Sequence, residues 1–161
     1  MRGGTLPPGL LFAALGLALA FAPPRIRIWS LIALVATLAG LSQIAIPWNW
    51  LEIAFLGCWV STAGTAAAVH LPRGLGWGNG LTLAFNAGLW ASAVVALSGA
   101  PLDLLKALPA VILILPAAWL IGRRASIAVR VVASWLIAIA ILAAALPFLP
   151  VTPGYVPDHL E

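Results

Sequence analysis

Charged residues are scarce in this chain. Aspartate, glutamate, lysine and arginine together make up 7% of the 161 residues, whereas a globular domain carries about 25%. Hydrophobic residues make up 63%, and a soluble core of this size cannot absorb so much apolar surface. We therefore expect an integral membrane protein. Abundant alanine, leucine and arginine with a single lysine lead us to expect a bacterial cytoplasmic membrane.

Cysteine and catalytic motifs are also missing. Cys58 stands alone, which excludes an intrachain disulfide and a multi-cysteine metal site. The sequence contains no CxxC or HExxH motif, no carboxylate pair and no Ser–His–acid set. We therefore expect no enzyme, no metal and no cofactor. The net charge of +4 comes largely from arginines between hydrophobic runs, which indicates topology signals and lipid headgroup contacts rather than nucleic-acid binding.

Long hydrophobic runs without strand-type alternation are what the chain has instead. A helix satisfies its backbone hydrogen bonds internally in lipid, so we predict an all-α integral membrane protein, a compact bundle of six transmembrane helices within residues 1–149. The runs cover residues 9–22, 28–46, 50–71, 81–98, 102–121 and 127–149. The proline-rich tail, 150–161, is expected to be extended.

The first run is short for a span, which normally needs about 20 residues. A short, tilted or partly re-entrant helix, leaving five full spans, is one interpretation. A signal segment is another, because Ala20-Phe21-Ala22 resembles a cleavage site. We favour the short helix, since five further hydrophobic runs make a separate targeting segment superfluous.

Proline and glycine mark several boundaries. Pro7 and Pro8 suit the first turn of a helix, where a missing N–H group costs little. Pro109 and Pro116 are seven residues apart, so both should bend the fifth helix on nearly one face. The stretch 74–80 is rich in glycine, and we expect a non-helical loop there.

Arginine distribution predicts the orientation. The loops after the first, third and fifth runs hold Arg25, Arg27, Arg73, Arg123 and Arg124. Positively charged loops face the cytoplasm in membrane proteins. We therefore expect these loops in the cytoplasm and the C-terminus outside.

Small residues form stripes on the third and fourth runs. Gly57, Ser61 and Thr65 are four residues apart on one face of the third run, and Gly88 belongs to a similar stripe on the fourth. Such stripes let helix backbones approach closely in lipid. We predict that these two helices pack through the stripes and that the third is the central helix of the bundle.

Three polar side chains are candidates for contact with a transported solute: Glu52, Asn86 and Gln43. Polar groups inside a membrane often mark ion or proton paths. Two of them also have a structural interpretation. Glu52 lies one turn into its run, beside interfacial tryptophans, where a solvated acid is common. Asn86 could instead hold two helices together by a hydrogen bond.

His70 is a candidate cofactor ligand. It follows the small residue Ala66 by four positions, a spacing that leaves room for a flat macrocycle such as heme. A histidine at the end of a helix, favoured there by the helix dipole, is the more common situation.

Two classes of function follow. The first is a non-enzymatic accessory or structural subunit of a membrane complex, whose partners are lipids, other membrane subunits or further copies of the chain. Its support is the shortage of buried charge and the small-residue faces. The second is a small oligomeric transporter or channel, with Glu52 and Asn86 near the pathway.

Overall fold

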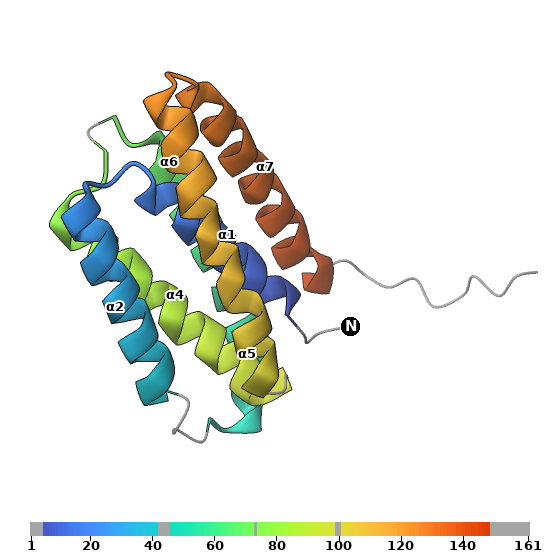
Figure 1. Ribbon diagram of the computed structural model, residues 1–161. Helices are drawn as coiled ribbons and strands as arrows, with labels where there is room; N and C mark the ends of the chain where they lie inside the picture. The colour runs from blue at the N-terminus through green and yellow to red at the C-terminus, as the bar shows by residue number, and fades with distance from the viewer. Residues whose placement is uncertain (1–4, 42–45, 73, 99–100, 149–161) are drawn as a thin grey trace, which may run out of the picture.

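The computed structural model describes residues 5–41, 46–72, 74–98 and 101–148, and over these ranges the chain forms helices and no strands (Figure 1). The elements, in order, are α1 (Leu6–Leu19), α2 (Pro24–Leu41), the 3-10 turn η1 (Trp48–Trp50), α3 (Leu51–Ala67), η2 (Ala68–His70), α4 (Trp77–Ser98), α5 (Pro101–Ala107), η3 (Leu108–Leu113), α6 (Ile114–Gly122), α7 (Ser126–Ala145) and η4 (Leu146–Phe148). The all-helical fold expected from the hydrophobic runs is confirmed.

Five helical segments are long and apolar enough to cross a membrane: α2, α3 with its flanking turns, α4, the α5–α6 segment, and α7 with η4. Their outward faces carry large apolar side chains, such as Trp135 and Leu142 on α7. An apolar exterior is unfavourable in water and suits contact with lipid tails. The fold therefore fits a membrane location.

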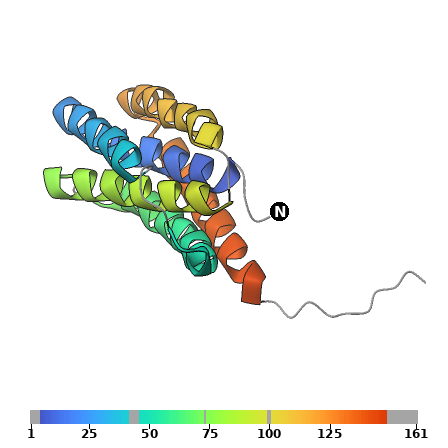
Figure 2. The ribbon, with the colours of Figure 1, turned by 90° about the horizontal axis from the view of Figure 1, so that it is seen from below.

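The helix α1, which is shorter than the five candidate spans, lies at the centre of the bundle. Nearly all of its side chains are buried, and Figure 2 shows it between the α5–α6 segment and α4. Its 14 residues extend about 21 Å, less than the roughly 30 Å of a hydrocarbon core. The prediction that the third run is the central helix is therefore wrong, because α3 keeps one face exposed while α1 keeps none.

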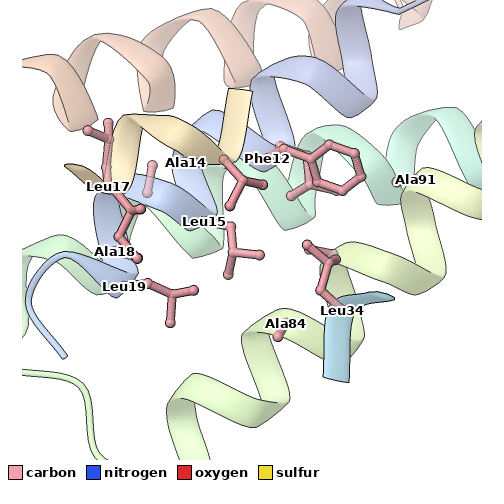
Figure 3. Packing of buried hydrophobic residues seen from close by; sticks show 14 of the residues in the cluster. Phe12, Ala14, Leu15, Leu17, Ala18, Leu19, Leu34, Ala84 and Ala91 are labelled. Carbon is pink, nitrogen blue, oxygen red and sulfur yellow. The ribbon is translucent and has the colours of Figure 1, made fainter. Parts of the chain in front are cut away.

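The core around α1 is built from apolar side chains of several helices. Figure 3 shows Leu15 and Leu19 of α1 beside Leu34 of α2 and Ala84 of α4. Leucine on one helix against alanine on the next fills space without polar atoms. The described interior of the bundle is thus largely apolar, and its buried polar members are Ser30, Ser61, Thr62, Thr65 and Ser92.

Proline sets the start of α1 and interrupts the fifth run. Pro7 and Pro8 occupy the first positions of α1, as predicted. The fifth run is divided into α5, η3 and α6, with Pro109 inside the 3-10 segment. Proline removes a backbone donor and favours such departures from the α-helix.

The η3 segment packs closely against α1. A methyl group added at Gly16 would lie 2.9 Å from the carbonyl oxygen of Val111 and 3.3 Å from the backbone nitrogen of Ile114. Gly16 is therefore the point where two backbones meet, and only hydrogen fits between them.

The glycine-rich stretch after residue 74 is partly helical, which corrects the expectation of a loop. α4 begins at Trp77 and includes Gly78 and Gly80. A methyl group at Gly80 would lie 2.8 Å from Ile26 and 3.0 Å from Ser30, both in α2. Close packing against α2 compensates for the low helix propensity of glycine.

Successive helices run in opposite directions, so charged side chains gather at the two ends of the bundle. Arg25, Arg27, Arg123 and Arg124 lie at the end where α1 and α6 finish. The described acids lie at the opposite end, Glu52 in the first turn of α3 and Asp103 in α5. We call the first the arginine end and the second the acidic end.

Candidate functional site

A largely apolar pocket with three polar side chains in its lining lies between α3 and α4, about halfway along both helices. Its volume is about 340 Å³, and it opens to the outside of the bundle. It is lined by Gly57, Val60, Ser61, Gly64, Thr65, Leu83, Asn86 and Trp90. We call this pocket the α3–α4 seam, and it gathers four of the residues that the sequence singled out.

Ser61 and Asn86 join the two helices across the seam. The amide nitrogen of Asn86 donates a hydrogen bond to the hydroxyl of Ser61. An amide in an apolar environment needs a partner, because its desolvation is costly when no bond replaces water. This contact is the one expected for a residue that holds helices together, and it leaves the carbonyl oxygen of Asn86 available for another donor.

Thr65 adds a hydroxyl whose hydrogen bond is missing. Its side chain is 0% exposed, and its Oγ1 atom has no partner among the described residues. By contrast, the hydroxyl of Thr62, three residues earlier on the same helix, donates a hydrogen bond to the carbonyl oxygen of Cys58 at 2.8 Å. Buried hydroxyls are normally paired. Among the described residues, Thr65 shares this lack of a partner with the buried polar atoms of Ser30, Trp59 and Ser92.

The helices α3 and α4 do pack together, but Gly57 and Gly88 do not face each other, as the predicted contact between the stripes would require. Gly57 of α3 lies under the indole ring of Trp90, so a glycine meets an aromatic side chain. Gly88 faces α2: a methyl group there would lie 2.8 Å from Thr37. Gly88 of α4 therefore serves the contact with α2, and Trp90 of α4 covers the α3 stripe at Gly57.

Glu52 lies in a different place. It is exposed at the acidic end and lines a separate pocket of about 280 Å³ with Pro147 and Phe148 of η4. Nine residues separate it from Ser61, which is about 14 Å along the helix. The structure therefore does not bring Glu52 and Asn86 together. Gln43 lies outside the described residues.

His70 contacts α7 near the arginine end. Its Nε2 atom lies 3.4 Å from Oγ of Ser134, and that hydroxyl is 3.0 Å from the carbonyl of Arg130, to which it donates. A hydroxyl that donates to a carbonyl can accept from the ring N–H. His70 is therefore engaged in a helix–helix contact. No group of three or more possible metal ligands occurs among the described residues.

Two contacts were not foreseen from the sequence. Trp90 covers Gly57, although its position four residues after Asn86 places both on one face of a helix. Arg27 reaches back to the end of α1, where Nε donates to Ala22 O and Nη2 donates to Ala20 O, each at 2.8 Å. The adjacent prolines at 23 and 24 are the sequence feature that signals the reversal of the chain.

No protein-family model, curated protein or solved structure matches this chain, so its interpretation rests on its own residues.

Proposed function

We propose that this chain is a non-enzymatic multi-pass membrane protein that serves as an accessory or structural subunit of a membrane complex. The position of the α3–α4 seam supports this proposal. The seam opens on the outside of the bundle, and the half-buried amide of Asn86, bonded to Ser61, lies in its lining. Polar groups facing lipid are unfavourable unless another helix covers them.

The shape of the seam suits a transmembrane helix of another subunit. Val60 and Gly64 form its exposed wall on α3, and a methyl group at Gly64 would meet no neighbouring atom within 4 Å. Small exposed residues let a second backbone approach closely. A polar side chain or backbone carbonyl of that helix would lie at the depth of Ser61 and Asn86.

The membrane in this proposal is the bacterial cytoplasmic membrane, with the arginine end in the cytoplasm. The clustering of Arg25, Arg27, Arg123 and Arg124 at one end supports that orientation. A cysteine scan of exposed positions with a membrane-impermeant thiol reagent in intact cells tests it. In unbroken cells, labelling of cysteines placed at the arginine end of the protein would contradict this orientation.

Co-purification tests the subunit role. The tagged chain is extracted from its native membrane in mild detergent, and the eluate is analysed by mass spectrometry and absorption spectroscopy. Gly64→Leu fills the open wall of the seam. Gly40→Leu is the matched control, because a methyl group at Gly40 on α2 also meets no neighbouring atom within 4 Å.

We expect stoichiometric companion subunits with the wild-type chain and with Gly40→Leu, and their loss with Gly64→Leu at unchanged thermal stability. A wild-type chain that elutes alone would contradict the proposal. Companions that remain bound to Gly64→Leu would place the contact on another face.

The second candidate is a small oligomeric transporter or channel. Asn86 offers an amide in a pocket that opens sideways, so a second copy would have to close the pathway. Glu52 lines another pocket and would act at the entrance. Solute flux into proteoliposomes containing a purified homo-oligomer tests this function. A transport function predicts that solute flux falls in the Asn86→Ala and Glu52→Gln variants. Flux that neither substitution changes would contradict this function.

A further inference from the structure

The described charged side chains at the arginine end are all basic. They are Arg25, Arg27, Arg123, Arg124 and, on the second turn of α7, Arg130. The described acids, Glu52 and Asp103, lie at the acidic end. Because no described carboxylate compensates these guanidinium groups, this end carries a positive field that attracts anions.

Two of these arginines contact the segment that follows α1. Arg27 donates to the carbonyls of Ala20 and Ala22, and the guanidinium of Arg130 lies 6.0 Å from the ring centroid of Phe21. Among the described residues, Arg25, Arg123 and Arg124 make no ion pair or side-chain hydrogen bond. Of these three, Arg123 and Arg124 are adjacent and occupy the turn between α6 and α7.

Trp119 places Arg123 at a defined position. The guanidinium carbon of Arg123 is 4.8 Å from the ring centroid of Trp119, and Trp119 is 59% exposed on the outer face of α6. A guanidinium stacked on an aromatic face keeps its N–H edges free for hydrogen bonds. An exposed tryptophan at the end of a membrane helix is typical of headgroup depth.

Arg124 occupies a backbone position that favours glycine. Its φ is 61°, in the left-handed region. The N–H of Ala125 donates to Leu120 O at 2.9 Å, and that of Arg124 donates to Ile121 O at 3.0 Å. This pattern is the Schellman motif, in which the left-handed residue is usually glycine. An arginine here costs about 1 kcal/mol of backbone strain, and the described contacts of its side chain provide no compensation.

We propose that Arg123 and Arg124 bind the phosphate of an anionic phospholipid headgroup at the membrane surface. Two adjacent guanidinium groups supply planar pairs of N–H donors that match phosphate oxygens. Trp119 lies beside them on the face that borders lipid, where the glycerol and upper acyl chain of the same lipid would rest. The inference depends on the membrane location of the bundle but not on its membership of a larger complex.

Lipid binding to the full-length chain tests the site. The protein in a neutral detergent is titrated with phosphatidylglycerol or with phosphatidylcholine of the same acyl chains, and bound lipid is counted by native mass spectrometry. The test variant is Arg123→Gln with Arg124→Gly, in which glycine retains the left-handed turn. The control variant is Arg25→Gln with Arg130→Gln, which removes the same charge from the same end.

We expect the wild-type chain and the control to prefer phosphatidylglycerol, and the turn variant to bind it roughly ten- to thirty-fold more weakly. Equal losses in both variants would overturn the proposal, because they would indicate a diffuse field rather than a site. Equal affinity for the two lipids in the wild-type chain would also overturn it. A third arm adds sodium phosphate: if millimolar phosphate displaces the lipid fully, the site takes free phosphate and the lipid assignment is wrong.

Discussion

The indole ring of Trp90 lies directly over Gly57, so the contact between α4 and α3 joins the largest side chain to the smallest residue. This pairing sits beside the hydrogen bond between Asn86 and Ser61. Together they fix the distance between the two helices at the depth where the seam opens. The helices α3 and α4 therefore contact each other directly at the seam, which opens on the outside of the bundle.

Gly57→Ala should destabilise the protein by about 1–3 kcal/mol, because the added methyl group occupies the place of the ring. Thermal unfolding in detergent measures the change. Gly64→Ala on the same helix is the control, since its methyl group enters open space and should be neutral or stabilising by up to about 1 kcal/mol. A Gly57→Ala variant as stable as the control would show that the ring moves aside at little cost.

A double-mutant cycle on Ser61→Ala and Asn86→Ala should give a coupling free energy of about 0.6 kcal/mol, with an upper limit near 1.7 kcal/mol. The physical reason is the single hydrogen bond between the two side chains. Ser134 lies far from Asn86, on α7 beside His70, so Ser134→Ala with Asn86→Ala should give no coupling. Coupling of equal size in both cycles would exclude a direct effect of the bond.

Gly16→Ala should cost at least as much as Gly57→Ala. The methyl group would lie 2.9 Å from a backbone oxygen of η3, and a backbone cannot rotate away as a side chain can. Gly9→Ala is the control on the same helix, because nothing lies within 4 Å of its added methyl group. Thermal unfolding of the two variants compares their stability. Equal unfolding temperatures would mean that α1 is not held against η3.

Arg27→Gln should lower the free energy of unfolding by about 1.5–3 kcal/mol, because the carbonyls of Ala20 and Ala22 lose charged donors at the negative end of α1. Arg25→Gln removes the same charge from an exposed side chain and should change it by no more than about 0.5 kcal/mol. Chemical unfolding of the two variants under one set of conditions makes the comparison. If they lose stability equally, overall charge matters and the hydrogen bonds do not.

Much of the helix layout could be predicted from local chemistry. Pro7 and Pro8 do begin α1, and the proline-containing fifth run does depart from a regular α-helix. The start of α4 could not be predicted, because Gly78 and Gly80 oppose a helix locally. What allows the helix there is the contact of Gly80 with Ile26 and Ser30, residues more than 45 positions away in the chain.

The candidate site was predictable in its members but not in its pairing. Ser61 and Asn86 stood out as polar or small residues in apolar runs, and they meet. Gly88 stood out for the same reason, yet it faces Thr37. Helical periodicity predicts which residues share a face of a helix, but it does not predict which neighbouring helix that face contacts.

The sequence by itself determined that this chain forms apolar helices and where its arginines gather, because hydropathy, backbone hydrogen bonding and the order of the loops are local properties. Only the tertiary structure decided that α1 is central and that the α3–α4 seam opens outward. In lipid the tails are as apolar as a leucine side chain. In a membrane, a leucine facing the core and a leucine facing lipid would therefore be alike in sequence, and close contacts such as those at Gly16, Gly57, Gly80 and Gly88 distinguish inside from outside.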